Sequence, residues 1–350
     1  MDGTRVSSSA LHDARLAQLS ASSQSCHRLT QDSPLPLTYD FAIIGAQKTG
    51  TTSLAHYMLD HPQLCSGSEE WTIDFNIIDF MRLNKTQPGS IDRWVEKYRN
   101  LSSSRLWEQR SYCAAEKVRR SHANDDIGGC HLFGFSRPML SYLAISHAEW
   151  LHRAAPSLRL LFLVREPIQR ALSAWRMAWR STTIHTTFDS LVASGMKQLD
   201  RKERTRQTSD VVRRGLYAEQ IEAYLRFFAP QQLHIGISER FRDGLDEYNR
   251  LFAFLGVGNL TSLPRQTTSE AHAAKTDQNM TDATMRRLYA YYRPSTLVLY
   301  RDYLGEALSE WESWYRKHGI ADTGSRCARH GIPYRKREDS ARGDDGCLQR

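Results

Sequence analysis

The stretch DFAIIGAQKTGTTSL, residues 40–54, decides the fold. Asp40 to Gly45 is a short apolar run that ends in glycine, which is typical of a buried parallel strand. The pattern of Thr51 to Asp60 predicts a helix. We therefore expect a strand, a tight turn and a helix in direct succession.

The turn has the features of a phosphate cradle. Gly45 and Gly50 are separated by four residues, the glycine spacing of a P-loop. Glycine lets the backbone turn its N–H groups toward an anion, and the helix that follows adds the positive end of its dipole. Thr51, Thr52 and Ser53 supply hydroxyl donors. An ordinary glycine-rich turn between a strand and a helix is the alternative.

The lysine of this turn is not where an ATP-binding loop places it. A Walker loop has lysine directly after the second glycine and then Ser or Thr for magnesium. Here Thr51 follows Gly50, and the lysine is Lys48, inside the loop. This arrangement favours a phosphorylated cofactor other than ATP–magnesium, and no metal is expected.

Outward from this stretch, strand and helix patterns alternate. This alternation predicts a three-layer, P-loop-like α/β fold with a central, mostly parallel sheet flanked by helices. Further strands are expected at His131 to Phe135, Leu158 to Val164 and Gln232 to Ser238. Helices are expected at Ile91 to Tyr98, Leu106 to Arg120, Met139 to Ala154, Pro167 to Arg180, Gly215 to Phe228, Thr281 to Leu304 with an interruption at Pro294, and Glu306 to His318.

Composition bounds the class of protein. The chain has 350 residues, 25% of them charged, with 47 Lys or Arg against 39 Asp or Glu. These globular values exclude wholesale disorder, and no apolar run is long enough for a membrane span. We expect a flexible lead-in at residues 1–37, one domain at 38–320 and a polar tail at 321–350.

A second group of polar residues follows the apolar run LRLLFLV, residues 158–164. Arg165 comes directly after it, Pro167 suits the first turn of a helix, and Arg170 and Ser173 lie three residues apart on that helix. Ligands of open α/β sheets collect beyond the carboxyl ends of the strands. Arg165 can therefore join Lys48 in holding a phosphate, although a structural ion pair is an equal alternative.

With both groups considered, the chain resembles sulfotransferases that use 3′-phosphoadenosine-5′-phosphosulfate (PAPS), and most of all the Golgi heparan sulfate N- and O-sulfotransferase group. GAQKTGTTSL at 45–54 is similar to the 5′-phosphosulfate loop of that group, and LVREPIQRALSAW at 163–175 to its 3′-phosphate element. GLYAEQIEAY at 215–224 and LYAYYRPSTLVLY at 288–300 resemble two further segments.

The resemblance assigns roles to individual residues. It implies that Lys48 contacts the bridging oxygen of the phosphosulfate and that Arg165 and Ser173 hold the 3′-phosphate. The 5′-phosphate would be bound by Gln47, Thr49, Gly50, Thr51, Thr52 and Ser53. The general base of the family is a glutamate soon after the first helix, and EEWTIDF at 69–75 aligns with it. This alignment makes Glu70 the base and Glu69 its alternative.

The chain departs from the family pattern at two places, the first of which alters the acceptor side. Thr72 and Asp74 replace expected residues near the base. The segment GFSRP at 134–138 lacks the usual lysine, for which Arg137 can substitute. The altered segment leaves a non-catalytic PAPS-binding protein as one alternative to a sulfotransferase. A P-loop nucleotide kinase or NTPase is another, because those folds share the strand–loop–helix cradle.

The acceptor and the compartment stay open. An acidic glycan is favoured by resemblance over a small alcohol, a steroid-like lipid or a protein tyrosine, and nucleic acid is not expected. The basic stretch at 201–214 can line a glycan groove or form a solvated face. N-glycosylation triplets begin at Asn84, Asn100, Asn259 and Asn279, which favours the Golgi lumen. The absence of a visible signal or anchor favours the cytoplasm.

The six cysteines permit disulfides without requiring them. They contain no CxxC pair, so a structural zinc site is not expected. Cys113 with Cys130, and Cys327 with Cys347, are plausible local pairs.

Overall fold

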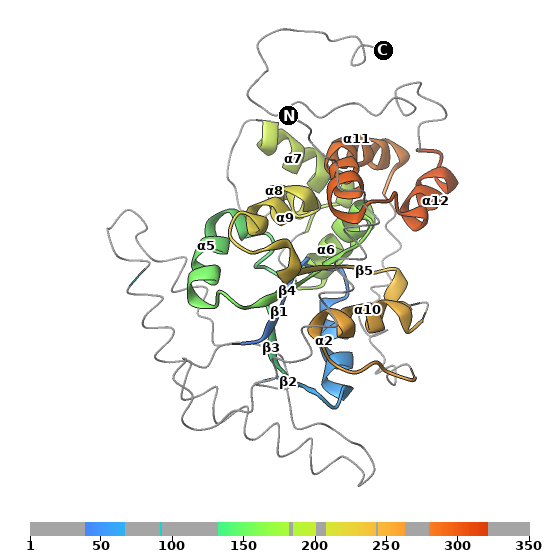
Figure 1. Ribbon diagram of the computed structural model, residues 1–350. Helices are drawn as coiled ribbons and strands as arrows, with labels where there is room; N and C mark the ends of the chain where they lie inside the picture. Colours follow the sequence, from blue (N-terminus) through green and yellow to red (C-terminus); the bar gives the residue numbers. More distant parts are fainter. Residues whose placement is uncertain are drawn as a thin grey trace, which may run out of the picture. The chain divides into compact units, whose positions relative to one another are not determined.

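A computed structural model of the chain describes residues 39–66, 92, 132–181, 185–200, 208–242, 244–262 and 280–320. The chain divides into two compact units, Met1–Ala307 and Leu308–Arg350. The first unit contains the sheet (Figure 1). Within the second, the described residues form helix α12, Ser309–Lys317, which lies inside the expected 306–318 segment.

The sheet of the first unit has five strands in the order β2-β3-β1-β4-β5. All four neighbouring pairs are parallel. The strands are β1 (Phe41–Gly45), β2 (Leu64–Ser66), β3 (Leu132–Ser136), β4 (Arg159–Val164) and β5 (Leu233–Ile237). The four strands expected from the sequence are confirmed, and β2 is an addition. Its three residues are too few to show a pattern.

Strand β1 occupies the middle of the sheet, between β3 and β4. Asp40 fixes this place just before the strand: its backbone N–H donates to Phe133 O at 2.8 Å, and its side-chain Oδ2 accepts from Phe133 N at 2.7 Å. The chain leaves β1 toward the β2 edge and later crosses to β4 on the other side. The loop after β1 therefore lies at the topological switch point, where α/β sheets bind ligands.

Helices cover both faces of the sheet, which makes three layers (Figure 1). On one face, α2 (Thr51–Asp60) and α10 (Asp246–Leu255) pack on alternate residues of the strands, such as Phe41, Ile43 and Leu161. On the other face, Phe162 of β4 meets Tyr217, the first residue of α9 (Tyr217–Leu225), with 6.2 Å between ring centroids. The alternation along β1 and β4 is the period-two pattern of strands with two buried faces.

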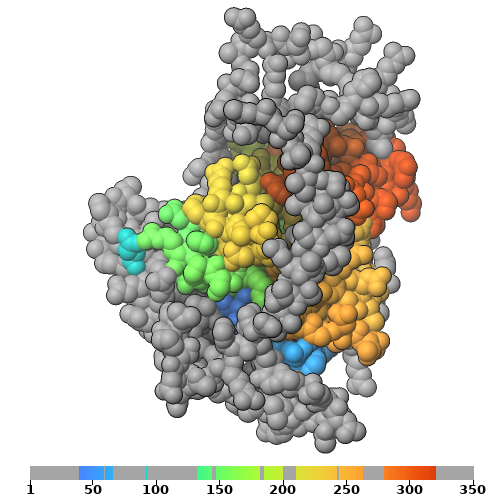
Figure 2. Space-filling view, viewed as in Figure 1, coloured from blue at the N-terminus to red at the C-terminus, as the bar shows by residue number. Residues whose placement is uncertain are grey.

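The first unit contains further helices. They are α5 (Ala144–Ala154), α6 (Pro167–Arg180), α7 (Phe188–Asp200), α8 (Thr208–Arg213) and α11 (Asp282–Val298), which continues as the π-helical segment η5 (Leu299–Leu304). Helices α5 and α9 contact each other, and they lie side by side in the space-filling view (Figure 2). No helix in the described ranges is long and apolar enough to cross a bilayer.

Two expectations about helices were wrong. The helix expected from Met139 begins at Ala144, because the residues before it form turns. The helix expected to break at Pro294 runs through this proline to Val298. Buried neighbours on both sides, Leu288 and Thr296, outweigh the hydrogen bond that proline cannot donate.

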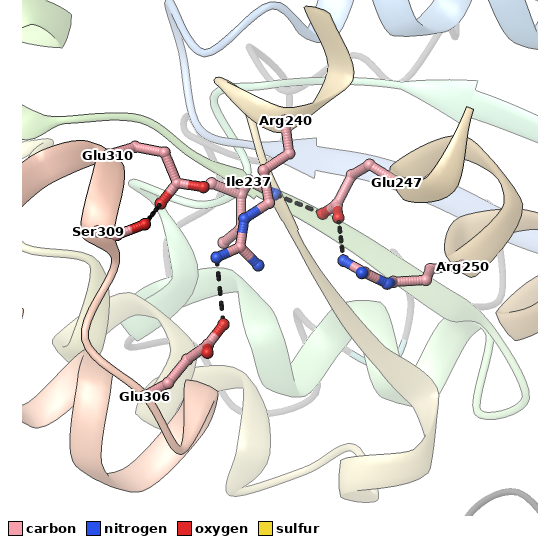
Figure 3. A network of polar contacts seen from close by, with 7 residues as sticks. All are labelled: Ile237, Arg240, Glu247, Arg250, Glu306, Ser309 and Glu310. Carbon is pink, nitrogen blue, oxygen red and sulfur yellow. Dashed lines mark hydrogen bonds and ion pairs between the residues drawn. The ribbon is translucent and has the colours of Figure 1, made fainter. Parts of the chain in front are cut away.

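A buried carboxylate joins β5 to α10. Glu247, 3% exposed, accepts a 2.8 Å hydrogen bond from Ile237 N at the end of β5. Its other oxygen pairs with Arg250 at 2.9 Å (Figure 3). Nearby, Arg240 reaches Glu306 at 3.1 Å, which ties the turn after β5 to the chain that follows η5. These contacts hold the carboxyl end of β5 in place beside that of β4.

Candidate active site

The loop after β1 has an unusual backbone that the sequence explains. Lys48 has φ 73° and Gly50 has φ 89°, so two residues of the loop are in the left-handed region. Glycine adopts this region freely, whereas lysine does so at a cost of about 1 kcal/mol or more. Strained left-handed residues cluster at functional sites, and successive left- and right-handed residues form anion-binding nests.

The loop is anchored to its neighbours through the backbone. Ala46 N donates to Leu163 O of β4 at 2.8 Å, and Ser141 N donates to Ile44 O at 2.7 Å. A Cβ on Gly45 would lie 2.2 Å from the Ser141 hydroxyl oxygen, so only glycine fits there. These contacts fix the position of the loop at the carboxyl end of β1.

The residues with hydroxyl groups in and after the loop differ in how far they are buried. Thr49 is 1% exposed, and its hydroxyl donates to Ala46 O at 2.6 Å, so this group stabilises the loop itself. Thr51 is also buried, Ser53 is half-buried, and Thr52 is exposed. The Thr49 hydroxyl is thus committed to the loop, whereas Thr51, Thr52 and Ser53 lie in the first turn of α2.

Lys48 lies among other positive charges. Its Nζ is 3.7 Å from Met177 Sδ on α6. Burial, together with the nearby charges of Arg180 and Arg165, lowers the pKa of the Lys48 ammonium. A half-buried lysine between two guanidinium groups favours a bound anion, because an anion would relieve both the desolvation and the repulsion.

Arg165 stands at the carboxyl end of β4 and touches the loop directly. Its Nη1 donates to Lys48 O at 3.3 Å, and its Nη2 approaches Gln169 Oε1 at 3.5 Å. The Arg165 carbonyl accepts from the Tyr217 hydroxyl at 2.8 Å. Burial and the charge of Arg242 lower the pKa of the Arg165 guanidinium. The expected proximity of Lys48 and Arg165 is confirmed.

Glu166 begins helix α6 and fixes the corner behind Arg165. It is 1% exposed, and its two oxygens accept from Ile168 N at 3.0 Å and from Gln169 N at 2.7 Å. Its own N–H donates to Glu239 Oε1 at 3.0 Å. Sequence reasoning missed both glutamates, although Pro167 at the first helical position marks the start of the helix that Glu166 caps.

One face of α6 is turned toward the loop. Gln169 meets Arg165, and two turns later Met177 meets Lys48. Ser173 lies midway between them on this face, half-buried, and its hydroxyl has no hydrogen bond within the described part of the chain. The expected grouping of Ser173 with Arg165 and Lys48 therefore agrees with the helical spacing.

The other neighbours of the loop come from the ends of β5 and β3, of which sequence reasoning had assigned only Arg137. Ser238 follows β5, is 8% exposed, and would lie 3.7 Å from a Cβ built on Gly50. Arg137 follows β3, and its N–H donates to Ile43 O at 2.8 Å. The backbone of Arg137 therefore lies beside β1, and its substitution for the missing lysine stays a prediction.

Gln47 is held by a residue distant in sequence. Its Oε1 accepts a hydrogen bond from Arg214 Nη1, which belongs to the turn between α8 and α9. Arg214 was expected to face either a glycan groove or solvent. Instead its side chain is 16% exposed and points at the loop. The first half of that basic stretch, residues 201–207, lies outside the described residues.

Several sequence predictions fall outside the described residues. Among them are both candidate bases, Glu69 and Glu70, the altered positions Thr72 and Asp74, the helices expected at 91–98 and 106–120, the lead-in and the tail. The expected cysteine pairs lie there too. The one described cysteine, Cys65 of β2, is disulfide-bonded.

The described residues contain no group of three or more His, Cys, Asp or Glu side chains that could hold a metal ion. His61, at the end of α2, uses both ring nitrogens in local contacts. Gln63 N donates to its Nδ1 at 3.1 Å, and its Nε2 lies 2.8 Å from Gly258 O. This histidine joins the end of α2 to the chain after α10.

Comparisons with known proteins agree with this geometry. The sulfotransferase family profile matches residues 40–258, which include the loop, the β4–α6 corner and β5. A solved sulfotransferase from Alicyclobacillus acidocaldarius superposes with a TM-score of 0.55 at 22% identity, over 79% of this chain and 99% of that one. This similarity shows the fold.

A second solved structure, a sulfotransferase domain from the curacin biosynthetic pathway, gives a TM-score of 0.35 at 14% identity, over 65% of this chain and 77% of that one. The search of curated proteins found no match. The family profile covers more than half of the chain, and its limits enclose every described residue assigned to the site. The chain belongs to the sulfotransferase family.

Proposed function

We propose that this protein transfers a sulfuryl group from PAPS to a hydroxyl or amine of an acceptor. The observation that carries the proposal is the place of Lys48, on a left-handed backbone after the central strand, with the charges of Arg165 and Arg180 near its ammonium. PAPS has two separate anionic ends. The loop around Lys48 suits the 5′-phosphosulfate, and Arg165 with Ser173 suits the 3′-phosphate.

Lys48 would stabilise the leaving group. Sulfuryl transfer resembles phosphoryl transfer, with a loose transition state and negative charge that develops on the leaving oxygen. The bond between sulfur and the bridging oxygen breaks as the acceptor oxygen or nitrogen bonds to sulfur, and 3′-phosphoadenosine-5′-phosphate (PAP) leaves. A fixed ammonium beside the bridging oxygen neutralises this charge without reorganisation. The Lys48 ammonium lies beside α6, 3.7 Å from Met177 Sδ.

The acceptor must lose a proton as it attacks. By the family resemblance, Glu70 takes this proton, and Glu69 is the alternative. A positioned general base typically contributes about 10²- to 10⁴-fold to the rate. Glu69 and Glu70 lie outside the described residues, so their assignment rests on the family resemblance.

The acceptor is proposed to be a carbohydrate. This rests on the similarity of the segments at 45–54 and 163–175 to the heparan sulfate N- and O-sulfotransferase group. The positive charges around Lys48 and the net charge of +8 are compatible with an acidic glycan. Either N- or O-sulfation is consistent with the proposal.

The compartment is proposed to be the Golgi lumen, with the cytoplasm as the alternative. Cys65 is disulfide-bonded, and disulfides persist in oxidising compartments. Asn259 and Thr261 of one glycosylation triplet are both exposed. Digestion with an N-glycosidase should increase the gel mobility of protein from a eukaryotic cell, and unchanged mobility together with free thiols would favour the cytoplasm.

The direct test of the proposed reaction is transfer of label from [³⁵S]PAPS to pooled acceptors, with glycans, small alcohols, phenols and tyrosine peptides in separate pools. We expect label in the glycan pool with wild-type protein, none with Lys48→Ala, and none with Glu70→Gln. Glu69→Gln is the matched control and should retain activity. PAP binding without transfer to any pool would instead identify a non-catalytic PAPS-binding protein.

A further inference from the structure

The segment from α8 to α9 reaches both phosphate elements of the site. Arg214 donates to the side chain of Gln47 in the loop after β1, and Tyr217 donates to the carbonyl of Arg165 at 2.8 Å. Arg214 and Gln47 are 167 residues apart in sequence. These contacts matter for function only if they change which hydrogen-bonding groups of the loop can bind a ligand.

Arg214 is itself held from several sides. Its Nη2 lies 3.6 Å from Asp210 Oδ2, and its guanidinium stacks 4.8 Å from the ring centroid of Tyr142. The Tyr142 hydroxyl donates to the other oxygen of Asp210. Gln220 Nε2 donates to the Arg214 carbonyl at 3.1 Å. The side chains of Arg214 and Asp210 are only 16% and 17% exposed, so water competes little for these bonds.

Tyr142 and Arg214 both carry their protons at neutral pH and therefore act as hydrogen-bond donors. Burial, with the hydrogen bond to Asp210, raises the pKa of the Tyr142 hydroxyl to about 12. Tyr142 therefore keeps its proton at neutral pH and can only donate to Asp210. Burial lowers the pKa of the Arg214 guanidinium, but arginine remains protonated in proteins.

The chemistry of the two side chains then fixes the orientation of Gln47. A primary amide has one oxygen that accepts and one nitrogen that donates, whereas a guanidinium only donates. Arg214 must face the oxygen of Gln47, as it does in the structure. The amide nitrogen of Gln47 has no acceptor within the described residues and is left to donate to a ligand.

We propose that Arg214 is a positioning residue that turns Gln47 into a hydrogen-bond donor for the anion bound at the loop, with Asp210 and Tyr142 holding Arg214. The direction of donation runs from Tyr142 and Arg214 to Asp210, and from Arg214 through Gln47 to the anion. This inference rests on the proposed function, because the anion is the 5′-phosphate end of PAPS or PAP. It assigns Arg214 to the cofactor and not to an acceptor groove.

The test is the affinity for PAP, measured by isothermal titration calorimetry on the full chain. Arg214→Ala and Gln47→Ala should each weaken PAP binding about 10-fold, the size of one charge-assisted hydrogen bond. The double variant should bind PAP with the same affinity as the single variant that binds it less tightly, since both changes remove the same donor. Arg214→Lys should recover most of the affinity, because an ammonium also donates to the amide oxygen.

Gln47→Glu separates positioning from a structural role. A glutamate keeps, and strengthens, the pairing with Arg214, but a carboxylate has no donor for the anion. We expect Gln47→Glu to bind PAP at least 10-fold more weakly while its thermal unfolding midpoint stays at or above that of wild type. This variant also remains informative if Arg214→Ala fails to fold.

Arg213→Ala is the matched control, since Arg213 is the neighbouring arginine and has no described contact with Gln47. Its PAP affinity should equal that of wild type. The inference is overturned if Gln47→Glu binds PAP as tightly as wild type, or if the losses in Arg214→Ala and Gln47→Ala add up in the double variant. Absence of PAP binding by the wild-type protein would overturn the proposed function itself.

Discussion

Two neighbouring parts of the site are held together in opposite ways. The loop after β1 depends on its backbone: Lys48 and Gly50 are left-handed, and the Thr49 hydroxyl bonds to Ala46 O. The corner between β4 and α6 depends on side chains, with Glu166 bonded to the start of the helix. The Lys48 side chain is thus left for a ligand, whereas the Glu166 side chain is committed to the fold.

This difference predicts different consequences of substitution in the two parts. Changes to Lys48 should affect ligand and turnover with little effect on stability. Changes to Glu166 should affect stability first and activity only through it.

The largest effect is expected for Lys48→Ala. Removal of one preorganised positive group at a developing negative charge typically costs about 10²- to 10³-fold in turnover. The only described partner of Lys48 Nζ is Met177 Sδ, at 3.7 Å, so the urea midpoint should hardly change. Steady-state kinetics with saturating PAPS and urea unfolding measure the two quantities. Turnover within a factor of two of wild type would remove Lys48 from the mechanism.

A substitution at the corner between β4 and α6 should lower stability first and activity only as a consequence. Glu166→Ala leaves the N–H groups of Ile168 and Gln169 without their acceptor, and we expect a loss of about 2 kcal/mol in the free energy of unfolding. Glu166→Ser keeps a capping oxygen and should lose less. Urea denaturation of the three proteins measures this, and an unchanged midpoint in Glu166→Ala would contradict the structural role of the corner.

The pKa of Lys48 predicts a proton uptake on binding. Burial and the charges of Arg180 and Arg165 lower this pKa in the free protein, so Lys48 loses its proton below the pH of an ordinary lysine. A bound anion favours the ammonium and raises the pKa again. In alkaline buffer, PAP binding should therefore take up protons.

Calorimetry of PAP binding in two buffers with different ionisation enthalpies measures that uptake. Lys48→Arg is the control, because arginine stays protonated throughout this range. Equal heats for wild-type protein in both buffers at every alkaline pH would contradict the electrostatic description of the loop.

The smallest effect concerns the backbone of the loop. Lys48→Ala and Lys48→Gly both remove the ammonium, but only glycine adopts φ 73° without strain. Lys48→Gly should be more stable than Lys48→Ala by about 1 kcal/mol, and equally inactive. A glycine variant no more stable than the alanine variant would show that the left-handed backbone stores no strain.

The parts of the site predicted from the sequence are those encoded locally. The loop from Gly45 to Ser53 and the corner at Arg165 each follow directly from a strand, a glycine or a proline that neighbours it. The central sheet was predicted for the same reason, because the apolar runs of its longer strands stand out. Helix α10 and strand β2 were missed, since one carries a mixed pattern and the other has three residues.

The contacts that complete the site were beyond sequence reasoning. Arg214 meets Gln47 only because the helices after β4 fold back over the sheet, and no spacing in the sequence encodes that approach. The basic stretch around Arg214 indicated an acidic partner, but its charge alone did not show which way the side chain points. Glu239 and Ser238 belong to the site because β5 pairs with β4, and the sequence alone does not show this pairing.

The central claim is that the loop after β1 binds a sulfonated or phosphorylated 3′-phosphoadenosine without a metal ion. Isothermal titration of the wild-type protein with PAP in the presence of a chelator, and with ATP plus magnesium in a parallel run, tests it most directly. We predict saturable heat with PAP and none with ATP and magnesium. Tight binding of ATP with magnesium and no heat with PAP would contradict the account.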